Sequence, residues 1–335
     1  MKISASLYSS KERTLPNLVK ALDRCHIDFF HIDCNDDMGV FKDIEEIKKI
    51  SKTPIDLHII SDRSEDYLPL VEKYQVEYVT FQYENLKSKL NLPASPHTRW
   101  GLAITSDTPI EVFEEYKDTC DFVLMMTTTP GQSGGKFRKE NFKKIRKFRN
   151  QFPGKKIYVD GGVNDETGFI LRMLGVHSVV SGSYLVNHES LGEALLHLRS
   201  SIIHSDFRIK DFMIDIEDAP VLDINKTSVS EIIKHIDEYN LGFTLLKDYE
   251  GNLAGISSNA DVRKALLKHL DDFNAMELSD VINTNPVFIA ESANISELLH
   301  LIQSKSFLIS YLPVVDDQNK LTGALSFINL IRSES

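Results

Sequence analysis

Short apolar segments alternate with amphipathic ones over about the first 205 residues, and this alternation constrains the fold more than any other feature. Eight such alternations predict a closed parallel (β/α)8 barrel, the TIM-barrel architecture. An open doubly wound sheet is the alternative, but no Gly-x-Gly-x-x-Gly follows the first expected strand, as a dinucleotide site requires. The expected strands are KISASL from residue 2, FFHID from 29, IDLHII from 55, YVTF from 78, WGLAI from 100, FVLMM from 122, KIYVD from 156 and SVVSG from 178.

A tandem repeat occupies the remainder of the chain. APVLDINKTSVSEIIKHI from Ala219 matches NPVFIAESANISELLHLI from Asn285, and GNLAGISSNADVRKAL matches NKLTGALSFINLIRS. Each copy is expected to contain a strand, a helix, two strands joined by a turn, and a second helix. We therefore predict an α/β barrel over residues 1–205 and a smaller α+β repeat pair over 206–335, with copies at about 209–270 and 277–335.

Charge and composition exclude several classes of protein. The formal net charge is −11, which argues against a nucleic-acid-binding face. No stretch approaches the ~20 consecutive apolar residues of a membrane span, so no membrane partner is expected. The three cysteines form no Cys-x-x-Cys pair. They indicate reduced thiols, and we expect a cytoplasmic protein.

Four polar residues lie at the ends of expected strands. His31 and Asp33 are two residues apart and so share one face of their strand, which for this pair alone also fits a solvated strand end. His58 closes the third strand and Asp160 the seventh. Functional residues of such barrels gather at the carboxyl ends of the strands, so all four are expected at one rim. Mixed nitrogen and oxygen ligands suit a divalent metal: zinc, iron(II), manganese or cobalt.

Glycine-rich segments follow the last three strands. They read TTPGQSGGKF after the sixth, DGGVN after the seventh and SGS after the eighth. Small residues let backbone N–H groups cradle an anion, and barrels usually bind phosphate at this position. A phosphorylated substrate is therefore predicted.

The motifs KISASL, HID, DLHII, LMMTTTPGQSGGKF, VDGGVNDET and VSGSYLV together resemble the ribulose-phosphate 3-epimerase family. The resemblance implies an isomerase that moves a proton at C3 of a ketose phosphate through an enediolate, with Asp33 and Asp160 as the acid–base pair. It implies a metal held by His31, Asp33, His58 and Asp160. The substrate and phosphate residues implied by the resemblance are Ser6, Met126, Gly131, Gly134, Gly161, Gly162, Gly182 and Ser183.

Three departures from the family pattern bear on the substrate. Asn35 and Ile60 stand where the family usually has methionines, and Ser133 stands where it usually has glycine. The simplest expected reaction interconverts D-ribulose 5-phosphate and D-xylulose 5-phosphate. Epimerisation of another pentulose or hexulose phosphate is the alternative, and a non-catalytic sensor of sugar phosphate and nucleotide is a third.

The C-terminal repeat resembles a pair of cystathionine-β-synthase-type (CBS) modules, which commonly bind adenosine nucleotides or related ligands. Ser258 and Asp261 fit the ribose motif of a Ser or Thr followed three residues later by Asp, whereas the second copy has Ser326 and Asn329. The resemblance implies one effector site, for an adenosine nucleotide or a nucleotide sugar. A role in dimerisation alone is the alternative, and a homo-oligomer is expected in either case.

Overall fold

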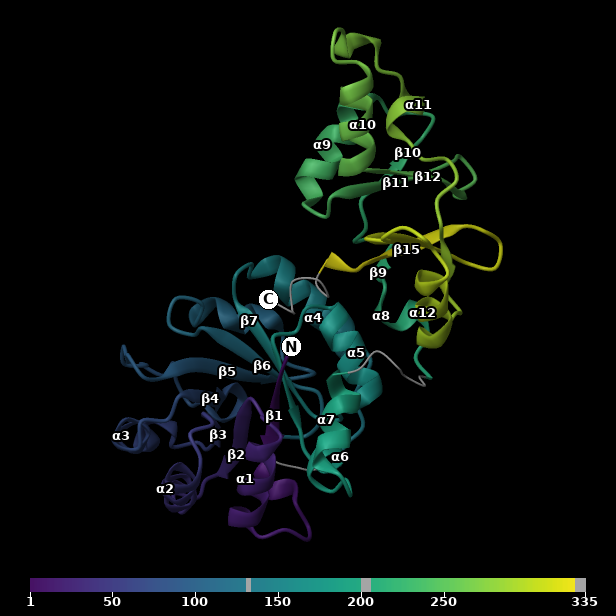
Figure 1. Cartoon of the computed structure of the whole chain (residues 1–335). Coiled ribbons are helices and arrows are strands. Elements are labelled where there is room, and N and C mark those ends of the chain that lie inside the picture. Colours follow the sequence, from purple (N-terminus) through teal and green to yellow (C-terminus); the bar gives the residue numbers. More distant parts are fainter. Residues whose placement is uncertain (131–133, 200–205, 329–335) are drawn as a thin grey trace. The chain divides into compact units, whose positions relative to one another are not determined.

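The computed structural model describes residues 1–130, 134–199 and 206–328, which fall into two compact units. The first unit contains a closed barrel of eight parallel strands, and the pairing of β1 with β8 closes it. The predicted barrel and its strands are confirmed (Figure 1). The strands are β1 Lys2–Ser6, β2 Phe29–Asn35, β3 Ile55–Ile60, β4 Tyr78–Gln82, β5 Arg99–Thr105, β6 Phe122–Met126, β7 Lys156–Asp160 and β8 Ser178–Ser181.

Helices connect the barrel strands. Their apolar residues recur at helical spacing, so each helix buries one face against the strands; in α1 the buried residues are Leu18, Val19 and Leu22. The α-helices of this unit are α1 Leu15–Arg24, α2 Val40–Ile50, α3 Leu68–Lys73, α4 Glu140–Gln151, α5 Asp165–Met173, α6 Ser183–Val186 and α7 Leu191–Arg199. The described residues of this unit also form the 3-10 helices η1 Leu7–Ser9, η2 Ser64–Tyr67, η3 Tyr83–Asn85 and η4 Ile110–Glu115.

One connection differs from the amphipathic α-helix that its sequence suggests. The segment PIEVFEEYK forms the 3-10 helix η4. Ile110 and Phe113 of η4 are buried, as is Tyr116, which caps its C-terminal end. These residues recur every three positions, a spacing that aligns them on one side of a helix with three residues per turn.

The second unit contains two small sheets that repeat one topology. In the first sheet β10 pairs parallel with β11, and β11 pairs antiparallel with β12; β13, β14 and β15 repeat this order. Both antiparallel pairs shift register at equivalent places, Leu246/Lys247 and Val314/Val315, as expected for a duplication. Strand β9 adds to the edge of the second sheet. The strands are β9 Ile214–Asp215, β10 Val221–Asp223, β11 Phe243–Lys247, β12 Leu253–Ser258, β13 Ile289–Ala290, β14 Tyr311–Val315 and β15 Leu321–Ser326.

Helices pack beside these two sheets. Their apolar side chains form a buried cluster that includes Ile232 of α9, Leu246 of β11 and Ala265 of α10. The helices are α8 Ile209–Phe212, α9 Val229–Tyr239, α10 Asn259–Lys268, η5 Phe273–Ala275, α11 Leu278–Val281 and α12 Ile295–Gln303. Among the described residues of both units, no helix is long and apolar enough to span a bilayer.

Candidate active site

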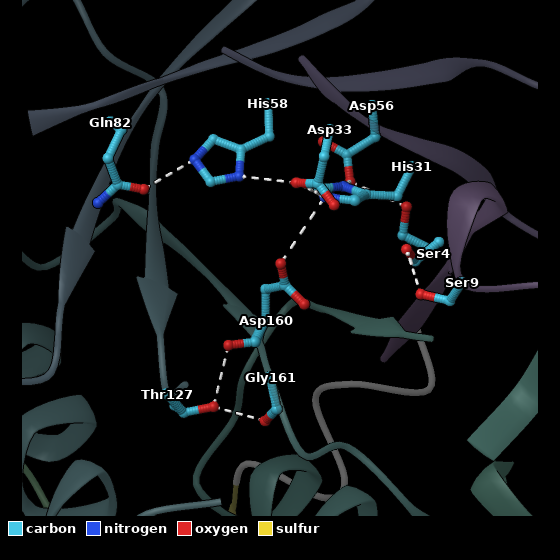
Figure 2. Close-up of polar contacts among 11 residues, drawn as sticks. Ser4, Ser9, His31, Asp33, Asp56, His58, Gln82, Thr127, Asp160 and Gly161 are labelled. Atoms are coloured by element: carbon cyan, nitrogen blue, oxygen red, sulfur yellow. Dashed lines mark hydrogen bonds and ion pairs between the residues drawn. The ribbon is translucent and has the colours of Figure 1, made fainter. Parts of the chain in front are cut away.

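Two histidines and two aspartates meet at the carboxyl end of the barrel (Figure 2). Asp33 of β2 and His58 of β3 are partners in the strand register, and Asp160 is the last residue of β7. The Oδ1 atom of Asp33 lies 3.3 Å from Nε2 of His31 and 3.2 Å from Nδ1 of His58. One ligand atom from each of the four residues lies within 4.8 Å of the others, so together they can hold one metal ion.

A buried carboxylate fixes the orientation of His31. Nδ1 of His31 lies 2.9 Å from Oδ2 of Asp56, and the hydroxyl of Ser4 donates to the same oxygen at 2.8 Å. Burial alone disfavours the charged imidazole, yet the carboxylates of Asp56 and Asp33 raise the pKa of His31 well above its usual value. Because a carboxylate only accepts, Nδ1 carries a proton, and in the neutral ring Nε2 presents its lone pair to the centre of the site.

A relay of three side chains orients His58. Its Nε2 atom lies 2.8 Å from Oε1 of Gln82, whose amide nitrogen donates to Oε2 of Glu84. Oε1 of Glu84 accepts from the backbone N–H of Thr105 at 2.9 Å. Since Glu84 only accepts, the amide group of Gln82 must point its nitrogen to Glu84 and its oxygen to His58. His58 therefore carries a proton on Nε2, and in the neutral ring the lone pair of Nδ1 is the one available to a metal ion.

The two aspartates have opposite pKa shifts. Burial alone would raise the pKa of Asp33, but its contacts with His31 and His58 hold it well below its usual range. Burial raises the pKa of Asp160 to about 6, and His31 opposes this only partly. Two carboxyl groups with pKa values pushed apart can serve as a base and an acid in the same site.

A cleft of about 710 Å³, partly open to solvent, adjoins these carboxylates. Asp33 and Asp160 line it, whereas His31 and His58 are fully buried behind them. Six other predicted residues line the cleft: Ser6, Gly134, Gly161, Gly162, Gly182 and Ser183. Met126 is buried in the barrel core with Phe122 and Leu124 and is not among the lining residues, and Gly131 lies outside the described residues.

The turn after β7 requires its two glycines. Gly161 and Gly162 have φ values of +112° and +62°. A Cβ atom on Gly161 would lie 2.3 Å from Oγ1 of Thr128, and one on Gly162 would lie 2.3 Å from the backbone nitrogen of Phe137. The hydroxyl of Thr127 donates to the carbonyl oxygens of Asp160 and Gly161 at 2.9 and 2.5 Å (Figure 2). The turn can therefore bring its backbone close to a ligand in the cleft.

In the second unit, Ser258 and Asp261 form a capping box at the start of α10. The hydroxyl of Ser258 donates to Oδ2 of Asp261 at 2.6 Å, and the backbone N–H of Ser258 donates to the same atom at 3.0 Å. Ser228 and Glu231 form the same arrangement at the start of α9. The predicted ribose pair thus has a structural role in helix initiation.

The site contains residues that the sequence analysis did not identify. Asp56 is two positions before His58, so the same-face spacing that singled out His31 and Asp33 applies to it as well. Gln82 ends β4, and Glu84 follows in η3. Tyr8 lines the cleft, and its hydroxyl donates to Asp43 at 2.6 Å. No sequence pattern pointed to these last three.

Comparison with known proteins agrees with this site. The sequence model described as "Ribulose-phosphate 3 epimerase family" matches residues 2–186, more than half of the chain, and that of the CBS domain matches residues 278–335. A ribulose-phosphate 3-epimerase of Methanocaldococcus jannaschii is 28% identical over 231 residues, covering 63% of this chain and 97% of the relative. One from Bacillus subtilis is 28% identical over 217 residues, covering 60% and 99%.

Among solved structures, the CBS-pair protein CBSX2 from Arabidopsis thaliana, in complex with AMP, is 24% identical to this chain. The similarity covers 38% of this chain and 96% of that one, with a TM-score of 0.32. The family match, in contrast, includes all eight barrel strands and the His/Asp group. The chain belongs to the ribulose-phosphate 3-epimerase family, as an isomerase acting on carbohydrates that also carries a CBS domain.

Proposed function

We propose that the barrel is a metal-dependent ketose-phosphate 3-epimerase, most simply one that interconverts D-ribulose 5-phosphate and D-xylulose 5-phosphate. The observation that carries the proposal is the group of two imidazoles and two carboxylates whose ligand atoms lie within 4.8 Å of one another. The adjoining cleft has a glycine-rich rim that suits a phosphate. Relatives of this chain named ribulose-phosphate 3-epimerase support the choice of substrate.

The donor set fits one divalent cation. His31 and His58 each have one ring nitrogen bonded to an outer acceptor, so the other nitrogen is available to the ion. Two nitrogens and two carboxylate oxygens suit zinc, iron(II), manganese or cobalt. Such an ion supplies positive charge beside the substrate oxygens and so lowers the free energy of the enediolate.

The two aspartates exchange protons with the substrate. Asp33, whose pKa is low, is ionised and takes the proton from C3, and the electron pair of the broken C–H bond passes into the enediolate. Asp160, whose pKa is raised to about 6, donates a proton to C3 from the opposite face. The reverse reaction exchanges the two roles. Because the carboxylates come from β2 and β7, they can flank a substrate in the cleft between them.

Incubation in deuterium oxide tests this reaction. With D-ribulose 5-phosphate, we expect xylulose 5-phosphate to form with deuterium at C3. Asp33→Asn and Asp160→Asn should each lower turnover by about 10²–10⁴-fold, with metal content measured in the same samples. Asp118→Asn, at an exposed carboxylate, is the matched control. Near-parental turnover in either site variant with metal bound would remove that residue from the proposed acid–base pair.

The alternatives give different results in the same assay. Deuterium exchange into other ketose phosphates, but not ribulose 5-phosphate, would indicate an epimerase of another pentulose or hexulose phosphate. Binding of sugar phosphate without any exchange would indicate a non-catalytic sensor.

We further propose that the repeats bind an adenosine nucleotide or a nucleotide sugar through Ser258 and Asp261. The carboxylate of Asp261 can accept hydrogen bonds from ribose hydroxyls once the hydroxyl of Ser258 turns away. Calorimetric titration of the full chain with AMP, ATP and a CMP-sugar tests this proposal. Asp261→Ala should abolish nucleotide binding. Glu231→Ala, which opens the matching capping box of α9, should lower the stability of the fold but leave nucleotide binding unchanged. Equal loss of binding in both variants would contradict the assignment. Self-association stays a prediction, which light scattering would test.

A further inference from the structure

Thr127 is hydrogen-bonded to the turn that follows β7. It comes directly after β6 and is fully buried. Its backbone N–H donates to the carbonyl oxygen of Asp160 at 2.7 Å, and its hydroxyl shares one proton between the carbonyl oxygens of Asp160 and Gly161 (Figure 2). The carbonyl of Asp160 therefore has two donors. Among the described residues, the carbonyl of Gly161 depends on the hydroxyl of Thr127 alone.

These bonds determine which way two peptide groups of the turn face. The described residues contain no cis peptide bond, and in a trans peptide the N–H group points opposite to the carbonyl. Since both carbonyls are directed at Thr127, the N–H groups of Gly161 and Gly162 are directed to the other side. Neither N–H has a hydrogen-bond partner in the part of the chain that the structure describes. Both glycines line the active-site cleft, so two donors are available to an anion there.

The peptide group between Gly161 and Gly162 has no side-chain restraint of its own. Neither residue carries a Cβ atom, so rotation about the bonds on either side of this peptide meets little resistance. Neither position accepts one, because a Cβ on Gly161 would lie 2.3 Å from Oγ1 of Thr128. If this peptide reversed, it would present a carbonyl oxygen where the N–H of Gly162 had been. A carbonyl only accepts hydrogen bonds and so cannot bind a phosphate dianion.

We propose that Thr127 is a positioning residue for the phosphate of the substrate, because its hydroxyl keeps the N–H of Gly162 directed at that phosphate. Thr127 is not among the residues that line the cleft, so it acts through the turn. The same side chain holds the backbone of Asp160, so the phosphate-binding donor and the proposed acid are fixed by one hydroxyl. This role rests on the proposed ketose-phosphate substrate and adds the residue that keeps the turn in its anion-binding form.

Ribitol 5-phosphate is a suitable probe because it carries the phosphate but has no ketone and cannot be epimerised. Its affinity for the full, zinc-loaded chain is measured by calorimetric titration. Thr127→Val keeps the size of the side chain and removes the hydroxyl. In this variant the affinity should fall about 10- to 100-fold, the contribution of a hydrogen bond to a charged group. Zinc affinity, measured by competition with a chelator, should stay within severalfold of the parent protein.

Two variants separate this role from a general loss of stability. Thr127→Ser restores the hydroxyl and should bind ribitol 5-phosphate within severalfold of the parent. Thr98→Val is the matched control, since Thr98 is also buried and its hydroxyl donates to the carbonyl oxygen of Val76 at 2.9 Å, directly before β5. This control should lower the melting temperature and leave the affinity for ribitol 5-phosphate unchanged.

Several outcomes would overturn the role of Thr127. They are unchanged affinity for ribitol 5-phosphate in Thr127→Val, an equal loss in Thr127→Ser, a loss of zinc affinity as large as that of ribitol 5-phosphate, and no binding of ribitol 5-phosphate by the parent. The titration requires no turnover. A chain that binds the probe through Thr127 but exchanges no deuterium at C3 would contradict the epimerase proposal alone, so the two failures are distinguishable.

Discussion

Replacement of Glu84 by glutamine tests how the site sets the proton positions of His58. Oε1 of Glu84 accepts from the backbone N–H of Thr105, so in Glu84→Gln the amide oxygen must keep that position. The new amide nitrogen then faces the amide nitrogen of Gln82, two donors in contact. Gln82 relieves this contact by rotating its amide group, which points its nitrogen at Nε2 of His58.

The expected loss follows from the hydrogen bonds. After the rotation, an N–H of Gln82 faces the N–H of His58, and one of these two donors is left without an acceptor. Alternatively, the proton of His58 moves to Nδ1, where it blocks the lone pair that faces the metal. An unpaired buried donor costs about 1–3 kcal/mol. Each tenfold change in affinity corresponds to about 1.4 kcal/mol. We therefore expect metal affinity to fall about 10- to 100-fold, the usual effect of losing an outer partner of a metal ligand.

Competition with a chelator of known zinc affinity measures this loss. The matched control is the double variant Gln82→Glu with Glu84→Gln, which has the same net charge as the parent. In it the carboxylate at position 82 accepts from Nε2 of His58, and the amide at position 84 donates to that carboxylate. Affinity should recover to within severalfold of the parent. An unaffected single variant, or a double variant no better than the single one, would refute the relay.

Three further predictions concern metal and pH. His58→Ala should lower bound metal per chain, and unchanged stoichiometry by elemental analysis would remove His58 from the ligand set. Chelation should abolish epimerisation and added zinc, manganese or cobalt should restore it; activity that survives complete removal contradicts metal dependence. Because burial lowers the pKa of folded His177 to about 4, the unfolded chain binds more protons between about pH 6.5 and 4, so stability falls on acidification. Over this pH range the free energy of unfolding, measured by urea titration, should fall less for His177→Asn than for the parent protein. The difference between the two should be on the order of 1 kcal/mol after solvent screening.

The sequence predicted the barrel and the meeting of His31, Asp33, His58 and Asp160 for one physical reason. Parallel strands in a closed barrel direct all their carboxyl ends to one rim, so residues at strand ends converge even when they are far apart in the chain. Asp56 obeys the same two-residue spacing and was therefore within reach of the same reasoning.

The relay behind His58 was not predictable in this way. Glu84 reaches Gln82 because η3 turns the chain at Tyr83–Asn85, and it reaches Thr105 because β5 ends beside it. Neither contact follows from periodicity. The pair Ser258 and Asp261 shows a different limit: a Ser with an acidic residue three positions later fits both a helix cap and a ribose contact, so spacing alone does not separate the two roles.

Of Asn35 and Ile60, the two positions where the family usually has methionines, only Asn35 is placed to affect substrate preference. It lines the cleft beside Asp33, whereas Ile60 is not among the lining residues. An amide that hydrogen-bonds a sugar hydroxyl discriminates strongly against a sugar that leaves it unpaired, while a methionine offers only apolar contact. We therefore expect Asn35→Met to change the ratio of kcat/KM for ribulose 5-phosphate to that for a hexulose phosphate by about tenfold or more, which equals about 1.4 kcal/mol. Ile60→Met is the matched control and should leave the ratio unchanged. A ratio that responds to position 60 but not to position 35 would place the determinant outside the cleft wall and contradict this assignment.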